Sequence, residues 1–170
     1  MLNLSNIITD SIVDGPGIRT TIFSQGCPHH CPGCHNPSTW SFEGGTEMTE
    51  ETVLEIVKSN PLCKGVTFSG GEPFVQAEAF ARLAVLLKSA GYEVASYSGF
   101  TFEQLQCGTP AQQKLLAHID VLIDGPFILE QRSLSTIFRG SKNQRILNVP
   151  ASLSAGQAIC ITKGRWAGEY

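Results

Sequence analysis

The sequence of 170 residues lacks the features that would place the protein in a membrane or on a nucleic acid. No apolar run approaches the roughly 20 residues of a membrane-spanning helix. The first residues, MLNLSNIITDS, have neither the basic region nor the apolar stretch of a signal peptide. A net charge of −3 gives no sign of an anionic partner. We therefore expect a cytoplasmic protein with no membrane and no nucleic acid among its partners.

Internal repeats, low-complexity tracts and linkers long enough to separate domains are also absent. A chain of this length can bury about 70% of its unfolded surface, so we expect a single domain over residues 1–170. Short β-rich runs alternate with helical patterns along the chain, and this alternation is typical of parallel strands joined by right-handed crossovers. The fold class is therefore α/β, with parallel strands and flanking helices.

The pattern predicts four strands, at residues 18–24, 66–69, 93–97 and 121–123, and two weaker ones at 145–149 and 158–162. Helices are expected to begin after Thr49, at about residue 76, at a capping box made by Thr101 and Gln104, and at about Pro110. The loops CPHHC, GGEP, YSGF and DGPF all follow predicted strands. Because active sites of such folds gather at the carboxyl ends of the strands, we expect these loops to meet.

Cysteine is plentiful, with six in the chain, and in a reducing compartment this favours metal or redox chemistry over disulfides. Cys27, Cys31 and Cys34 have the spacing C-x3-C-x2-C, and the prolines between them exclude a helix, so the chain must wrap around one object. One interpretation is a structural zinc site whose fourth ligand is a nearby histidine: His29, His30 or His35.

The other interpretation of the same loop is a four-iron cluster. Clusters that only carry electrons usually have four cysteine ligands, whereas three ligands leave one iron open for chemistry. The remaining cysteines, Cys63, Cys107 and Cys160, stand alone in apolar surroundings, so we expect core residues rather than a fourth ligand.

The GGEP loop has a plain interpretation as a tight turn that places a carboxylate near a helix start. Its functional interpretation is a ligand site: Gly70 and Gly71 would let a ligand approach the backbone closely. Glu72 would accept a charge-assisted hydrogen bond from the ligand.

Together, C-x3-C-x2-C after one strand and GGE after the next resemble the radical S-adenosylmethionine (SAM) superfamily. The resemblance implies a partial, open β/α barrel and a [4Fe-4S] cluster held by Cys27, Cys31 and Cys34. It also implies SAM bound to the open iron, with Glu72 facing its ammonium group. An electron from the cluster would break a C–S bond of SAM and release a 5′-deoxyadenosyl radical, so no catalytic residue beyond these cofactors is implied.

The resemblance also implies the remaining contacts to SAM. The residue before the third cysteine is commonly aromatic in this superfamily but is Gly33 here, so His35, next to Asn36, is expected to supply part of the adenine contact. Ser98 and Asp124 match polar groups that contact the ribose or carboxylate of SAM, or a nearby monovalent cation.

Two further segments, VDGPGIRTTIFSQGC and IFRGSKNQRI, resemble the activating enzymes of glycyl-radical proteins, and most closely those of anaerobic ribonucleoside-triphosphate reductase. The implied reaction removes a hydrogen atom from a glycine of the reductase large subunit, with a low-potential reductant such as flavodoxin or ferredoxin. An activator of another enzyme, such as pyruvate formate-lyase, is the alternative. Charged residues expected on the docking surface are Asp14, Arg19, Arg139, Lys142 and Arg145.

Overall fold

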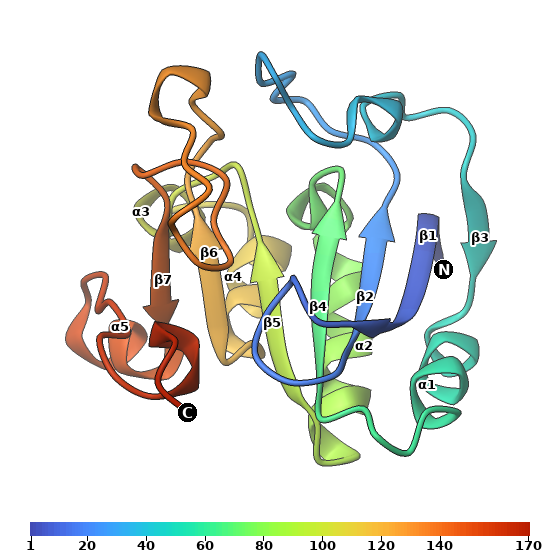
Figure 1. The fold of residues 1–170 in the computed structure, drawn as a ribbon. Helices are drawn as coiled ribbons and strands as arrows, with labels where there is room; N and C mark the ends of the chain where they lie inside the picture. The colour runs from blue at the N-terminus through green and yellow to red at the C-terminus, as the bar shows by residue number, and fades with distance from the viewer.

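The computed structural model describes residues 1–170 as an α/β fold built on one seven-stranded sheet with the order β3-β1-β2-β4-β5-β6-β7 (Figure 1). The strands are β1 (Leu2–Ser11), β2 (Arg19–Ser24), β3 (Thr46–Met48), β4 (Gly65–Gly70), β5 (Glu93–Tyr97), β6 (Val121–Asp124) and β7 (Arg145–Asn148). The central strands β2, β4, β5 and β6 are mutually parallel. The outer strands join through antiparallel pairs.

Side-chain caps fix where several of the helices begin. The helices are α1 (Glu50–Lys58), α2 (Ala77–Ser89), α3 (Phe102–Gln106), α4 (Pro110–Ala117) and α5 (Val149–Ala155), with 3-10 turns at Pro37–Thr39, Pro73–Gln76, Leu129–Gln131 and Arg165–Ala167. Thr49 accepts a hydrogen bond from Thr52 N, and Thr101 forms a capping box with Gln104, which confirms both predicted helix starts.

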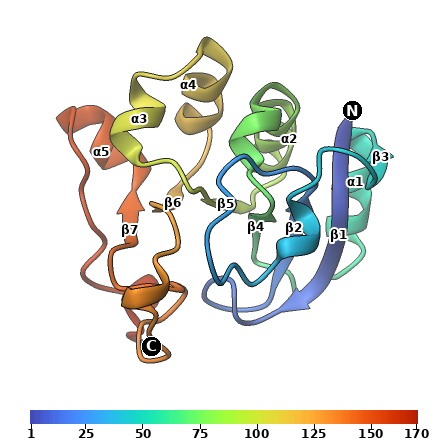
Figure 2. The same cartoon turned by 90° about the horizontal axis from the view of Figure 1, so that it is seen from above.

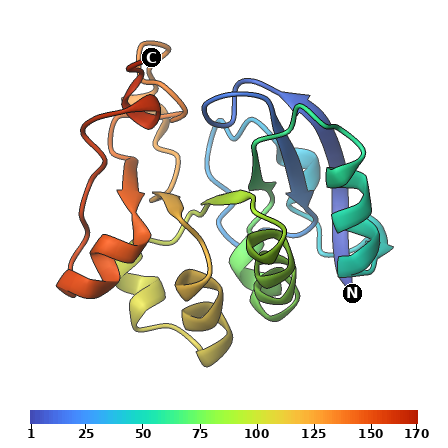
Figure 3. The same ribbon diagram turned by 90° about the horizontal axis from the view of Figure 1, so that it is seen from below.

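The helices and the long loops lie on opposite sides of the sheet. Helices α2 and α4 cover one face, with α1, α3 and α5 beside them, while the β1–β2 loop and the carboxyl-terminal segment lie on the other side (Figures 2 and 3). The main core contains 25 buried residues, including Phe68, Phe80 and Leu83. A smaller cluster of five buried residues, including Ile123 and Trp166, fills the opposite side.

The outer strands correct the expectation of a purely parallel sheet. Strand β7 forms where predicted but is antiparallel to β6, because residues 125–144 contain only a short 3-10 turn and no α-helix that would carry the chain back along the sheet. Residues 158–162 form no strand and contribute only an isolated bridge at Cys160. Strand β1 was not predicted, since two register shifts interrupt the alternation that would mark it.

Arg19 anchors the side of the sheet that lacks helices. Its side chain is 2% exposed, so the prediction that it is a surface docking residue is wrong. Its Nη1 donates to Glu93 Oε1 (2.8 Å) and its Nε donates to Thr67 Oγ1 (2.9 Å). The guanidinium also lies 5.1 Å from the ring centroid of Trp166. One buried cation therefore ties β2, β4 and β5 to the carboxyl-terminal segment.

We expect Arg19→Leu to lower the free energy of unfolding by roughly 2–3 kcal/mol, because it removes charge-assisted hydrogen bonds from a buried site. Urea unfolding followed by circular dichroism measures the loss. Lys58→Leu is the matched control: Lys58 and its partner Glu55 are both exposed, so its loss should stay below about 1 kcal/mol. Equal losses would contradict an anchoring role for Arg19.

Candidate cluster and cofactor site

A cavity of about 380 Å³ opens where the parallel strands end. Its wall is built by the four loops that follow β2, β4, β5 and β6, which confirms that CPHHC, GGEP, YSGF and DGPF meet at one edge of the sheet. The predicted site residues on this wall are Asp14, Cys27, Cys31, Cys34, His35, Asn36, Gly70, Gly71, Ser98 and Arg139. Most of the predicted site residues therefore lie together at the carboxyl ends of the parallel strands.

Backbone hydrogen bonds close the cysteine loop at its base. Gly26 N donates to Thr39 O (2.7 Å), and Cys27 N donates to Trp40 O (3.1 Å). Between these two bonds the chain wraps through a left-handed conformation at His30, where φ is 49°. These two bonds join the start of the loop to its end, and the left-handed residue lets the chain turn back between them.

All three predicted cysteine ligands face the cavity, but no three metal-ligating side chains in the structure lie close enough together to hold one ion. Burial raises the pKa of the Cys27 thiol, a backbone N–H at His29 opposes this, and the negative charge of Glu72 raises the pKa further. Trp40 also lines the cavity, and its buried Nε1–H has no hydrogen-bond partner. Three thiols and an unpaired donor on one wall fit an iron–sulfur cluster.

The three histidines of the loop have separate partners. His29 bonds a carboxylate of the GGEP loop. The ring of His30 stacks on Trp40 at 4.8 Å between centroids, and the ring of His35 lies 5.3 Å from that of Phe127. Each imidazole thus has a partner outside the three cysteines, and no Cys3His ligand group is formed.

Glu72 is the polar centre of the site. Its side chain is fully buried and accepts four hydrogen bonds. Oε1 accepts from Phe74 N (3.0 Å) and Ser98 Oγ (2.9 Å). Oε2 accepts from Gly99 N (2.7 Å) and His29 Nε2 (2.7 Å). The carboxylate thus holds together the loops that follow β2, β4 and β5, and no Lys or Arg pairs with it.

The two glycines before Glu72 allow the GGEP loop to pack closely against the backbone at the end of β2. A Cβ on Gly70 would lie 2.6 Å from Ser24 N, and one on Gly71 would lie 2.3 Å from Gly26 O. In this tight space Gly71 N donates to Ser24 O, and Glu72 N donates to Gly26 O (both 2.8 Å). Both glycines also line the cavity. The glycines that were predicted to let a ligand approach the backbone are therefore the same ones that let the two loops pack together.

The position before the third cysteine has no room for a side chain. Gly33 has φ +77°, and a Cβ there would lie 2.7 Å from Leu129 Cδ1 and 3.2 Å from Phe127 Cε1. Phe127 itself lines the cavity and packs against His35. Phe127 was not predicted as a site residue, although an aromatic residue within DGPF, directly after a strand, was the available signal.

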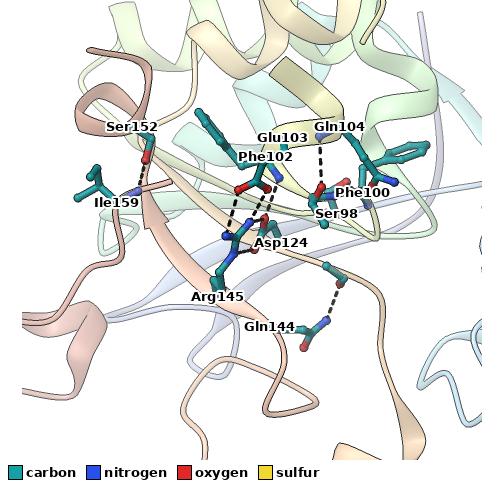
Figure 4. Close-up of polar contacts among 12 residues, drawn as sticks. Ser98, Phe100, Phe102, Glu103, Gln104, Asp124, Gln144, Arg145, Ser152 and Ile159 are labelled. Atoms are coloured by element: carbon teal, nitrogen blue, oxygen red, sulfur yellow. Dashed lines mark hydrogen bonds and ion pairs between the residues drawn. The ribbon is translucent and has the colours of Figure 1, made fainter. Parts of the chain in front are cut away.

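Asp124 and Arg145 are placed differently from their predicted roles in cofactor binding and docking. Neither lines the main cavity. The Asp124 carboxylate accepts from Phe102 N (2.7 Å) and Arg145 Nε (3.0 Å), and Arg145 also pairs with Glu103, as Figure 4 shows. These two carboxylates raise the pKa of Arg145. The group holds α3 against β6 and β7, which is a structural role.

The other predicted docking residues surround the cavities. Asp14 lines the main cavity, where its Oδ2 accepts from Ser11 Oγ (2.8 Å) and Thr21 Oγ1 (2.9 Å). Arg139 lies between the main cavity and a second one of about 350 Å³, and Lys142 is exposed at the second.

The cysteines outside the loop divide into two kinds. Cys63 is buried as expected, and its Sγ donates to Gly65 O. Cys107 and Cys160 are exposed, so the prediction that they are core residues is wrong. Cys107 follows the short helix α3, and Cys160 lies in the irregular segment after α5, where the apolar neighbours in the sequence do not form a buried strand.

Comparison with known proteins identifies the family. Residues 13–147 match the family described as a 4Fe-4S single cluster domain. The anaerobic ribonucleoside-triphosphate reductase-activating protein of Vibrio cholerae is 36% identical over 143 residues, which cover 79% of this chain and 90% of that protein. The chain belongs to this activating-protein family. The protein of the same name from Enterobacteria phage T4 is 33% identical over 153 residues, covering 85% and 93% of the two chains.

A solved structure of QueE from Escherichia coli shares the fold, with a TM-score of 0.51 and 20% identity. The match covers 59% of this chain and 53% of QueE, so this chain spans about half of that protein. The family match favours the iron–sulfur interpretation of the cysteine loop over zinc. Within the structure, no helix combines the length and the apolar character needed to cross a bilayer.

We expect Gly71→Ala to displace the cysteine loop, because its Cβ would meet the carbonyl oxygens of Gly26 and Thr39, which are backbone atoms. Overpacking of this kind costs typically 1–3 kcal/mol, and iron uptake during anaerobic reconstitution should fall as well. Gly91→Ala strains a left-handed position (φ +91°) that has nothing within 4 Å, so it is the control for a destabilised fold with an undisturbed cysteine loop. Normal iron content in Gly71→Ala would show that the loop tolerates the methyl group.

Proposed function

We propose that this protein reductively cleaves SAM and removes a hydrogen atom from a glycine Cα of anaerobic ribonucleoside-triphosphate reductase, leaving a glycyl radical on that enzyme. The observation that carries the proposal is that the three C-x3-C-x2-C cysteines line one cavity, with the buried GGE carboxylate directly behind His29 of the same wall. The chain's relatives are named as activating proteins of that reductase, which supports this enzyme as the protein substrate.

In this proposal Cys27, Cys31 and Cys34 hold a [4Fe-4S] cluster with one open iron, and Glu72 accepts a hydrogen bond from the ammonium group of SAM. When bound and reduced, the cluster supplies the electron that breaks a sulfonium C–S bond of SAM, and the adenosyl fragment takes the hydrogen atom. The protein binds and orients these groups and excludes water. No general base is required, because a hydrogen atom rather than a proton leaves the glycine.

Other residues of the cavity would orient SAM. The hydroxyl of Ser98 holds Glu72 in place. The rings of His35 and Phe127 are in contact and would form a wall for adenine. Asn36 lies on the same wall and offers an amide to the ligand.

We also propose that residues 1–170 form a single domain with the partial, open β/α barrel of the radical SAM superfamily. Four parallel central strands and one main core between the sheet and its helices support this. The low-potential reductant would be a flavodoxin or a ferredoxin, and the protein would work in the cytoplasm, where thiols stay reduced.

The charge distribution supports a docking surface for the reductase. Residues 131–168 contain no Asp or Glu, although the whole chain has a net charge of −3. Their six cations are Arg132, Arg139, Lys142, Arg145, Lys163 and Arg165. Among these only Arg145 forms an ion pair within the fold. We propose that Arg139 and Lys142, with Asp14 at the cavity, contact the reductase, since unpaired cations are available to steer an acidic partner surface.

The ligand assignment predicts that Cys27→Ala, Cys31→Ala and Cys34→Ala each abolish iron binding and SAM cleavage. Anaerobic reconstitution followed by iron and sulfide analysis measures the cluster, and 5′-deoxyadenosine formation measures cleavage. Cys107→Ala and Cys160→Ala are the controls, since both side chains are exposed and lie outside the main cavity. Loss of the cluster in either control, or one tight zinc in place of iron, would contradict the assignment.

The substrate assignment predicts a glycine-centred doublet in the electron paramagnetic resonance spectrum when the reduced protein, SAM and an anaerobic ribonucleotide reductase are mixed. Lys142→Glu should weaken the doublet at low ionic strength while sparing SAM cleavage without the reductase. Lys114→Glu, an exposed change on α4, is the control. A doublet seen only with another glycyl-radical enzyme would overturn the substrate, and no protein radical with any partner would overturn the activase function.

A further inference from the structure

All hydrogen-bonding positions of the Glu72 carboxylate are filled. Two donors approach each oxygen at 2.7–3.0 Å, and an ionised carboxylate offers about four lone-pair sites. A cationic ligand that binds this carboxylate must therefore displace one of the donors already present. The four donors differ in how readily they can leave.

Three of the four donors are fixed parts of the fold. Phe74 N–H belongs to the 3-10 turn that Glu72 itself caps, and Gly99 N–H belongs to the loop after β5. Ser98 is 5% exposed, and its hydroxyl also accepts a backbone N–H from its own loop. His29 is the exception, because it is a side chain on the cavity wall with 18% exposure and can move by rotating its own bonds.

The place that His29 occupies is shaped for its ring. A Cβ on Gly99 would lie 2.4 Å from His29 Cδ2, so only glycine leaves room for the imidazole. The ring of Phe100 meets that of His29 edge-on, with centroids 4.6 Å apart. Because an ionised carboxylate only accepts hydrogen bonds, the Nε2 of His29 carries the hydrogen that bonds Glu72.

We propose that His29 is a placeholder for the ammonium group of the cofactor. It pairs the buried Glu72 carboxylate and yields this position when the ammonium arrives. The identity of the cation rests on the proposed function, whereas the pairing does not. His29 lies two residues from both Cys27 and Cys31, so its release also frees the chain between the first two cysteines. His29 is thus a positioning residue that sets cofactor affinity by competition.

The first test is a double-mutant cycle on the full-length protein without metal. His29→Leu keeps the bulk but donates no hydrogen bond, and it should lower the folding equilibrium constant about ten- to hundredfold in urea unfolding. In a Glu72→Gln background, the fold-change in the folding equilibrium constant caused by His29→Leu should be at least threefold smaller. His30→Leu is the control, because His30 stacks on Trp40 and makes no contact with Glu72. Additive effects of the His29 and Glu72 changes would overturn the pairing.

The second test measures SAM binding by equilibrium dialysis to the reconstituted protein with its cluster oxidised. His29→Leu should bind SAM about three- to tenfold more tightly, since no donor has to leave. His29→Gln, whose amide can still donate, should stay near the wild-type affinity. Weaker binding in His29→Leu would overturn the placeholder role alone. No SAM binding in any variant, the wild type included, would overturn the proposed function and the placeholder role together.

Discussion

A buried carboxylate whose charge is met almost entirely by hydrogen-bond donors organises this protein. Glu72 is fully buried, and no Lys or Arg lies within ion-pair distance of it. Burying a charge in this way is costly unless every lone pair is satisfied. The donors must therefore come to the carboxylate, and they come from three different loops. The site is ordered because an unpaired Glu72 would be more costly than the ordering of these loops.

The parallel order of the central strands makes this convergence possible. Strands β2, β4 and β5 are neighbours and run in one direction, so the loops at their carboxyl ends start within one or two strand spacings of each other. At the other end of β2, the buried cation Arg19 fills the side without helices, together with Trp166. The buried Arg19 thus lies at the start of β2, where it stabilises the sheet, and the buried Glu72 lies beyond the end of β2, next to the cavity.

The sequence predicted those parts of the site that depend on local spacing. The three cysteines, GGEP and the Thr101 capping box follow from short motifs, and all were found where expected. It did not predict the contacts that depend on tertiary packing. Arg19 was predicted as a surface charge because its partners, Glu93 and Trp166, are far from it in the sequence. Asp124 likewise follows a strand as a ligand would, and its engagement by Arg145 depends on the antiparallel return of β7.

Backbone hydrogen bonds confine any rearrangement of the cysteine loop to residues 27–39. Backbone bonds at Gly26 and Cys27 hold the ends of the loop, while the thiols between them are not yet gathered into a ligand group. Left-handed residues such as His30 and Gly33 allow the inner backbone to turn without disturbing the sheet. Metal binding draws its ligands together and couples to local folding. Gathering three thiols would therefore change the cysteine loop and, because His29 lies in that loop and bonds Glu72, would also affect Glu72.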